Sequence, residues 1–310
     1  MLIHRNPDNK ILHTMLIGEM NAYIHALTTG TVWERKLASL DGPRAYSAFV
    51  EDAEPSPSTS TLDLPARGAT AIGGAAFIES VASMDRETRE AAVLRELLKG
   101  NIPSFLRRLV SVTVKAKLDD GVEHTATFEV MPDYLAIGSD ADFVRMPMNP
   151  YTAQTFCDAA GLALPTHKMS MDIWRQAQVR LIPQPLTEAR ESPATFLESH
   201  RLIEEQAAGI RRGGIWAGIK KDIVISNRLQ EREHRLAIYG WHYPSGEPIQ
   251  PLTIVHVDWY VDYSHGARPL RRTILVDGKE MSYDDVLRDP RLSALLSDEG
   301  PIAQPRYVTK

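Results

Sequence analysis

The sequence contains a single cysteine, Cys157, among 310 residues. One cysteine cannot form a disulfide within the chain, and it cannot supply the several thiolates of a Cys-rich zinc site. The sequence also lacks an apolar run approaching the roughly 18 residues that span a bilayer. It shows no basic start followed by an apolar segment and a small-residue cleavage site. We therefore expect a cytoplasmic protein that does not contact a membrane.

Four common catalytic motifs are absent as well: the GxxxxGK[ST] phosphate loop, the dinucleotide-binding GxGxxG, the zinc-binding HExxH and the nucleophile elbow GxSxG. Their absence excludes the common NTPases, dinucleotide enzymes, zincins and α/β-hydrolases, and we expect no cofactor. An excess of basic residues is also missing, since the net charge is −5. This charge argues against nucleic acid as a partner.

The residues that are present predict one main domain with an N-terminal extension. Hydrophobic residues make up 43% and charged residues 24% of the chain, which is enough apolar material for a sizeable core. Apolar residues recur at helical spacing between Ile11 and Leu27, and a segment rich in Pro, Ser and Thr covers residues 54–61. We expect a helical segment over 1–53, a linker over 54–79 and the main domain over 80–310.

The main domain is predicted to be α+β, with a mixed or antiparallel sheet and flanking helices. Alternating apolar residues on both sides of Asp119-Asp120-Gly121 predict a hairpin over residues 110–130. Asn149-Pro150, Thr166 and Ser192-Pro193 are typical helix starts. Helices and strands occur in runs rather than in strict alternation, which favours α+β over a doubly wound fold. The strands expected after residue 214 cover residues 219–226, 236–241, 252–261 and 272–276.

Aromatic and histidine residues are concentrated between Tyr239 and Arg268. This block holds three of the ten histidines, four of the ten tyrosines and two of the five tryptophans. Such a concentration is typical of a ligand-binding cleft, although a wet sheet edge or satisfied core groups give the same pattern. We predict that aromatic walls and polar donors from this block and from the preceding strand bind a peptide. The predicted peptide-binding residues are Lys220, Asp222, Trp241, His242, His256, Trp259, Tyr260, Tyr263, His265 and Arg268.

Two catalytic alternatives use the same block. His256 and Asp258 lie two residues apart on a predicted strand, so they would share one face and could hold a metal with His242 or His265. Alternatively, Ser264 could act as a nucleophile with a histidine base. We expect no bound metal. We interpret Cys157 as a small core residue, because it falls within a predicted helix rather than at its N-terminus.

Three sequence segments resemble an uncharacterised group of bacterial proteins, many of them secreted. These segments are Tyr239-Gly-Trp-His242, Pro248-Ile-Gln-Pro-Leu252 and Tyr263-Ser-His-Gly-Ala-Arg-Pro-Leu270; the resemblance extends over residues 80–307 and also includes Lys220-Lys-Asp222. The Ser-His-Gly element is also similar to the Ser-His-Gly-Cys-Ile-Arg signature of L,D-transpeptidases, in which the cysteine is the nucleophile. Here Ala267 occupies that position, so the resemblance implies that the covalent chemistry is lost.

The chain also resembles the peptide-binding proteins of the crocagin pathway, which implies a role in the biosynthesis of ribosomal peptide natural products. Our first hypothesis is therefore a peptide-binding accessory protein with an enzyme-like cleft, which would be a non-catalytic relative of hydrolases. The alternative is a hydrolase of peptide or cell-wall-type amide bonds that uses a metal or a Ser/His site. A third hypothesis is a structural homodimer whose helical N-terminus forms the interface. The sequence does not decide between an enzyme and a binding protein.

Overall fold

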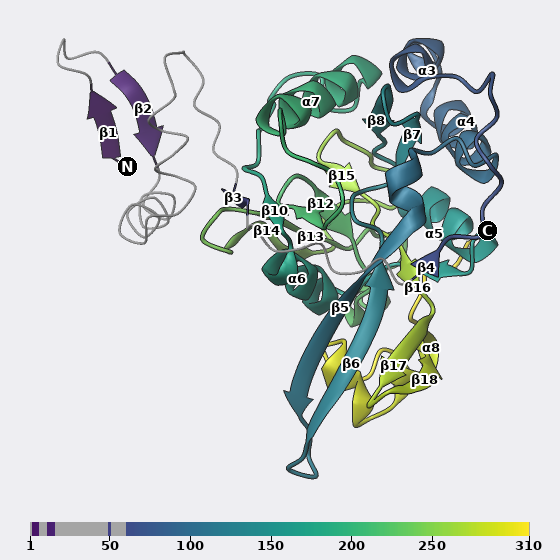
Figure 1. The fold of residues 1–310 in the computed structure, drawn as a ribbon, viewed down its shortest axis with the longest axis vertical. Helices are drawn as coiled ribbons and strands as arrows, with labels where there is room; N and C mark the ends of the chain where they lie inside the picture. The colour runs from purple at the N-terminus through teal and green to yellow at the C-terminus, as the bar shows by residue number, and fades with distance from the viewer. Residues whose placement is uncertain (1, 6–10, 16–48, 51–59, 310) are drawn as a thin grey trace.

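A long antiparallel hairpin runs through the computed structural model, which describes residues 2–5, 11–15, 49–50 and 60–309 (Figure 1). Strands β5 (Arg108–Lys117) and β6 (Glu123–Val130) pair in continuous register from Val110↔Val130 to Lys117↔Glu123. Gly121 closes the turn with a φ of 76°, a conformation that glycine adopts without a Cβ clash. The hairpin predicted from the alternating sequence is confirmed.

The strands form an α+β arrangement of antiparallel and mixed sheets, as the sequence predicts. In the sheet that contains the hairpin, the strand order is β18-β17-β6-β16-β9, with β5 on β6 and β4 on β5. Its other strands are β4 (Ser60–Thr61), β9 (Leu162–Ala163), β16 (Leu270–Arg271), β17 (Thr273–Val276) and β18 (Lys279–Ser282).

A second, four-stranded sheet has the order β14-β13-β12-β15. Its strands are β12 (Lys221–Ile223), β13 (Ile238–His242), β14 (Pro248–Thr253) and β15 (His265–Gly266). The smaller sheets combine β1 (Leu2–Arg5) with β2 (Ile11–Met15), β7 (Ala136–Gly138) with β8 (Phe143–Arg145), and β3 (Phe49–Val50) and β11 (Trp216–Ala217) with β10 (Val179–Arg180).

Side-chain caps define the starts of the central helices. Asn149, Thr166 and Ser192 each accept a backbone N–H from the residue three positions further along, as an N-cap does. All three helix starts predicted from the sequence are therefore confirmed. The α-helices are α3 (Gly74–Val81), α4 (Arg86–Leu98), α5 (Pro150–Ala159), α6 (His167–Gln176), α7 (Pro193–Gln206) and α8 (Tyr283–Arg288), and the 3₁₀ helices are η1 (Ser104–Arg107), η2 (Asn227–Gln230) and η3 (Leu292–Leu295).

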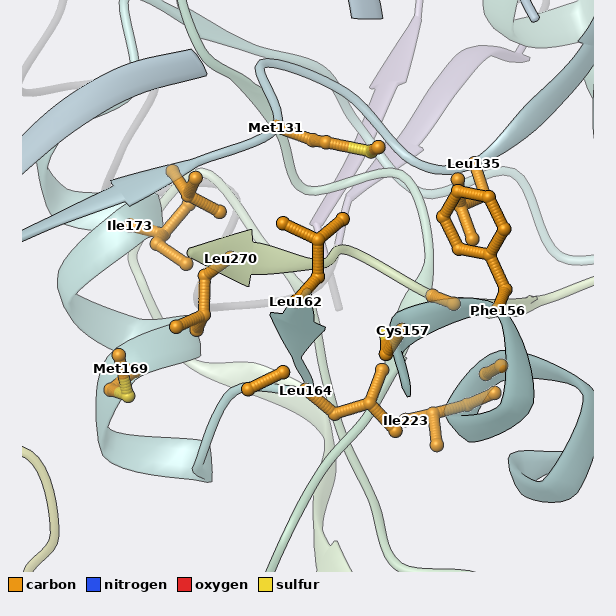
Figure 2. Close-up of a cluster of buried hydrophobic side chains, with 14 of the residues drawn as sticks. Met131, Leu135, Phe156, Cys157, Leu162, Leu164, Met169, Ile173, Ile223 and Leu270 are labelled. Atoms are coloured by element: carbon orange, nitrogen blue, oxygen red, sulfur yellow. The ribbon is translucent and has the colours of Figure 1, made fainter. Parts of the chain in front are cut away.

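The main apolar core lies between helices α5 and α6 and the strands that they cover (Figure 2). Cys157 on α5 is fully buried there, beside Phe156 and near Leu162 of β9. Burial raises the pKa of the Cys157 thiol, so the thiol stays protonated and unreactive at neutral pH. The interpretation of Cys157 as a small core residue is confirmed.

Three predicted boundaries differ from the structure. Most of the expected N-terminal helical segment lies outside the described residues. The parts that are described are strands: β1 and β2 form an antiparallel pair, and β3 pairs with β10. Elements that pack with the main domain occur before residue 80, because Ser60 and Thr61 pair with β5 and α3 already starts at Gly74. The strand expected over 252–261 is β14, which ends at Thr253. This strand begins earlier than predicted because the turn after β13 closes at Gly246, and β14 therefore pairs with β13 from Pro248 onward.

Candidate functional site

Strand β12 separates two groups of buried polar side chains. It pairs antiparallel with β13 and parallel with β15, so it lies inside the four-stranded sheet. Because successive side chains of a strand point to opposite faces, Lys221 and Asp222 lie on different sides of this sheet. Lys221 pairs in register with His265, which places both side chains on the same face.

Three rings gather on the Lys221 face of the sheet. The rings of His256 and Tyr260 are stacked with their centroids 4.5 Å apart. The His265 ring lies 5.9 Å from His256 and 5.6 Å from Tyr260. His265 is fully buried, whereas His256 and Tyr260 are partly exposed. We call the group formed by Arg190, Lys221, His256, Tyr260, Asp262 and His265 the His265 cluster.

Asp262 organises this cluster as a buried hydrogen-bond acceptor. Its carboxylate accepts hydrogen bonds from the hydroxyls of Ser264 and Tyr260, and it pairs with the Arg190 guanidinium at 2.7 Å. Burial alone would raise the pKa of Asp262. The neighbouring His265, the Ser264 hydrogen bond and Lys221 outweigh burial and lower this pKa to about 2. Asp262 is therefore ionised at neutral pH and holds the side chains around it in place.

Several donors of the His265 cluster have no partner within the described part of the chain. Neither ring nitrogen of His265 makes a hydrogen bond to a described residue, and the buried Nε of Arg190 makes none to these residues either. The Lys221 ammonium makes no ion pair with a described residue and lies 5.2 Å above the ring of Trp241. Burial lowers the pKa of His265 to about 3, so this imidazole is neutral at pH 7. Buried polar groups without partners are uncommon and call for an explanation, such as a ligand.

The geometry around Ser264 does not resemble a nucleophile–base pair. Its hydroxyl donates to Asp262, and its backbone N–H donates to the same carboxylate oxygen at 2.8 Å. A carboxylate with a pKa of about 2 is a weak base. His265 contacts Asp262 at 4.0 Å and has no hydrogen bond to Ser264 within the residues described. The three residues are adjacent without forming the serine–histidine contact that a triad requires.

The prediction that His256 and Asp258 share a strand face is wrong. Residues 254–260 have left the strand, and Asp258 lies in a turn. Asp258 accepts the hydroxyl of Tyr151 and contacts the ring of His234 at 3.0 Å, while His256 stacks on Tyr260. Within the described ranges, no three His, Cys, Asp or Glu side chains are grouped as metal ligands.

The opposite face of the sheet, toward α6, holds Asp222 and His242. Tyr134 donates its hydroxyl to Asp222 Oδ2 at 3.4 Å, while Oδ1 has no partner among the residues described. Burial raises the pKa of Asp222 to about 7. The His242 ring lies 5.3 Å from Trp174 and 5.4 Å from Tyr239, and burial lowers its pKa to about 4. His242 is therefore separated by the sheet from His256 and His265.

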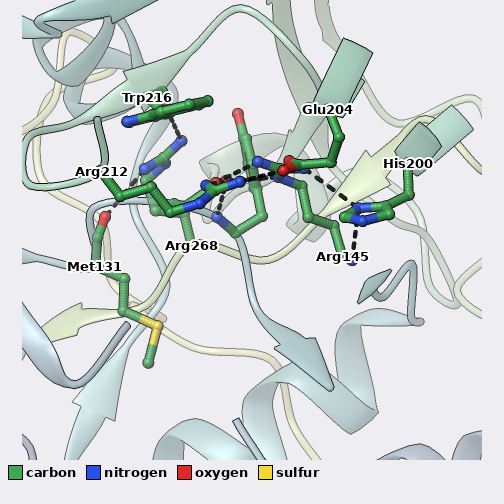
Figure 3. Close-up of polar contacts among 9 residues, drawn as sticks. Met131, Arg145, His200, Glu204, Arg212, Trp216 and Arg268 are labelled. Atoms are coloured by element: carbon green, nitrogen blue, oxygen red, sulfur yellow. Dashed lines mark hydrogen bonds and ion pairs between the residues drawn. The ribbon is translucent and has the colours of Figure 1, made fainter. Parts of the chain in front are cut away.

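Arg268 acts in the interior rather than as the ligand anchor that the sequence predicts. It is buried, and its guanidinium donates to the carbonyls of Met131 at 3.0 Å and Trp216 at 2.5 Å. The same guanidinium lies 4.2 Å from the centre of the Tyr134 ring. Figure 3 shows Arg268 beside Trp216. Its Nη1 and Nη2 groups are each already bonded to a backbone carbonyl inside the protein.

A network of charged residues borders Arg268 and is likewise structural. Arg145 forms ion pairs with Asp133 at 2.6 Å and with Glu204 at 2.7 Å. Arg212 reaches the same Glu204 at 2.5 Å and closes the network, as Figure 3 shows. The network ties α7 to β8 and to the loop before β7, and its charges are paired with one another.

The other predicted site residues fall into buried and exposed groups. Lys220 is buried, and its ammonium donates to the carbonyl of Tyr263; burial lowers the pKa of Lys220 to about 7. Trp241 packs against Tyr263, whose hydroxyl is hydrogen-bonded to the backbone of Leu186. Trp259 is 49% exposed, and Arg86 of α4 covers its ring at 4.1 Å. Only His256, Trp259 and Tyr260 of the predicted set therefore offer appreciable surface to a ligand.

Two residues of the His265 cluster, Arg190 and Lys221, are not among the predicted site residues. Lys221 could have been found from strand alternation, because it lies on the same face as His265 once β12 and β15 pair in parallel. No local pattern indicates Arg190, which reaches Asp262 from 72 residues away in sequence. A surface cavity of about 480 Å³ lies elsewhere, between residues 61–67, the segment of Ile102 and η1, and the loop at 139–140. Two arginines line this cavity, Arg67 and Arg107. Each donates hydrogen bonds to backbone carbonyls of the cavity wall, and these bonds hold the wall together.

No protein-family model, no curated protein and no solved structure matches the chain. In the described ranges, no helix combines the length and apolar character needed to cross a membrane.

Proposed function

We propose that this chain is a peptide-binding protein whose ligand contacts the His265 cluster, and that it serves the biosynthesis of a ribosomal peptide natural product. The observation that carries the proposal is the His265 ring, which is buried in a polar cluster with both nitrogens unpartnered among the described residues. A peptide offers both carbonyl acceptors and N–H donors, so it can bond to a neutral imidazole in either tautomer. The assignment to natural-product biosynthesis rests on the sequence resemblance alone.

The exposed surroundings of the cluster supply the apolar contact that peptide recognition uses. Trp259 is 49% exposed and Val255 is 64% exposed, and both lie within a few residues of His256 and Tyr260. Aromatic residues next to a small number of polar groups are typical of binding sites in which shape and polarity act together. The proposal does not depend on strand addition at β14, because Pro248 and Pro251 remove backbone donors from that strand.

A hydrolase of peptide or cell-wall-type amide bonds is the second candidate. The proximity of Ser264, Asp262 and His265 favours it, since these are the residue types of a catalytic triad. The direction of the Ser264 hydroxyl toward a carboxylate of low pKa favours binding without cleavage. The two candidates differ in one observable, namely whether a bound peptide is recovered intact.

Equilibrium dialysis against a random library of N-acetyl hexapeptides with free C-termini tests the proposal. We expect the wild-type protein to retain a subset of peptides at their intact masses, measured by mass spectrometry. Trp259→Ala and His256→Ala should each reduce retention at least fivefold. The matched control is Leu275→Ala, which removes another exposed apolar side chain, on β17, and should retain the same peptides as the wild type.

Two results of the same experiment would contradict the proposal. If the wild-type protein retains no peptide above a dialysis blank, peptide binding is refuted. If shortened peptides accumulate with the wild type and not with Ser264→Ala, the hydrolase is the correct function.

A further inference from the structure

The charges of the His265 cluster do not balance. Arg190 and Lys221 are its two cations, and Asp262 is its only ionised acid within the described residues. Burial lowers the pKa values of His256 and His265, so both imidazoles are neutral at pH 7 and add no charge. Asp262 is paired with Arg190, and the Lys221 ammonium is left as a buried positive charge without an ion pair to any described residue. Burying an unpaired charge is costly, and one added negative charge would remove that cost.

The unpartnered donors of the cluster suit one small planar anion. Arg190 has a buried Nε without a partner among described residues, and Lys221 carries three ammonium donors on the same face of the sheet as His265. A carboxylate presents two oxygens with about four lone-pair sites and accepts from arginine and lysine in short, charge-assisted bonds. A doubly charged phosphate would exceed the single positive charge that is available.

The exposed part of the cluster adjoins an exposed aromatic residue in the sequence. Arg190 has a side chain that is 40% exposed, and Tyr260 hydrogen-bonds to the same carboxylate as Arg190 does. Trp259 precedes Tyr260 directly and is half-exposed. A carboxylate that reaches Lys221 would therefore leave the neighbouring part of its ligand next to an aromatic ring.

We infer that the His265 cluster binds a single carboxylate of the peptide, held by Lys221 and Arg190, with the adjacent apolar side chain of the peptide against Trp259. This inference rests on the proposed function and deepens it by naming the group that is recognised. The carboxylate can be the C-terminus of the peptide or the side chain of an aspartate or glutamate, and both share the same chemistry.

The test compares two random hexapeptide libraries, N-acetylated in both cases, one with free C-termini and one with C-terminal amides. If a C-terminal carboxylate is bound, the wild-type protein should retain peptides of the free-acid library at least tenfold more strongly than those of the amide library. If a side-chain carboxylate is bound, both libraries should yield retained peptides that are enriched in aspartate or glutamate. Either result supports the inference.

Variants connect the carboxylate to the cluster. Lys221→Met and Arg190→Gln should each reduce the preference for the carboxylate to less than threefold while apolar peptides are still retained. Arg190→Gln serves as the second variant because its partly exposed site tolerates substitution if Lys221→Met does not fold. The matched controls are Lys279→Met and Arg211→Gln, at exposed positions outside the cluster, and both should keep the full preference.

The outcomes separate this inference from the proposed function. Equal retention from both libraries without acidic enrichment overturns the carboxylate inference and leaves peptide binding intact. Retention from neither library overturns peptide binding and the inference with it. A carboxylate preference that persists in both Lys221→Met and Arg190→Gln overturns the assignment to these residues.

Discussion

Replacement of Arg268 tests whether this residue stabilises the interior or binds a ligand. Arg268→Ala removes the donors to two buried carbonyls, those of Met131 and Trp216, and it removes the group that covers the Tyr134 ring. A buried polar group without a partner costs about 1–3 kcal/mol. Truncation of a large buried side chain to alanine costs about 2–5 kcal/mol. Because these effects overlap, we expect the free energy of unfolding to fall by about 4–5 kcal/mol.

A second variant separates the two contributions. Arg268→Met keeps most of the buried volume but removes the donors, so it should cost about 2–3 kcal/mol. Urea unfolding followed by circular dichroism measures both values, and Arg211→Ala, at an exposed position, should stay within about 0.5 kcal/mol of the wild type. A loss below about 1 kcal/mol for Arg268→Ala, together with loss of peptide retention, would refute the interior role and restore Arg268 as a ligand anchor.

Three further substitutions test other parts of the structure. The pKa of Asp222 is about 7 in the folded protein and near its ordinary value of 3.8 in the unfolded chain, so the free energy of unfolding should fall as pH rises from about 4 to 7. Asp222→Asn should remove this pH dependence, measured by urea titrations across that range. The same variant should stabilise the protein at pH 8 by about 1–3 kcal/mol. Gly266→Ala should destabilise the fold by at least about 2 kcal/mol, because the added Cβ would lie 2.5 Å from Tyr134 Cδ1 and 2.9 Å from Lys220 Cβ. A melting temperature equal to that of the wild type would contradict this packing. Cys157→Ala should cost about 1–2 kcal/mol in urea unfolding and leave peptide retention unchanged, whereas loss of retention at unchanged stability would mean that the thiol has a functional role.

Features that depend on neighbouring residues could be predicted from the sequence. The β5–β6 hairpin follows from alternation around one turn, and the caps at Asn149, Thr166 and Ser192 follow from short side chains that accept local N–H groups. The aromatic and histidine block contributes His256, Tyr260, Asp262 and His265 to the His265 cluster. Its local spacing failed at Asp258, because residues beyond Thr253 leave the strand and two-residue alternation no longer applies.

Features that depend on distant segments could not be predicted in this way. The carbonyl of Met131 that Arg268 bonds is 137 residues away, and Arg190 is 72 residues from Asp262. Neither pairing leaves a trace in local composition, and a buried arginine has the same sequence appearance as an exposed one. The separation of His242 from the other two histidines likewise depends on which face of the sheet α6 covers.

The position of Lys221 and Asp222 side by side on β12 makes this strand sensitive to changes in length. Deleting or inserting one residue just before β12 would shift its pairing by one position and exchange the two faces. The Lys221 ammonium would then enter the space beside Tyr134 and α6, and the Asp222 carboxyl would lie next to Asp262. A cation would therefore replace the acid on the α6 face, and a second acid would replace the cation in the His265 cluster. Length variation in this protein should therefore be tolerated least at a three-residue strand, and a scan of single-residue deletions across residues 214–226 would locate its minimum there.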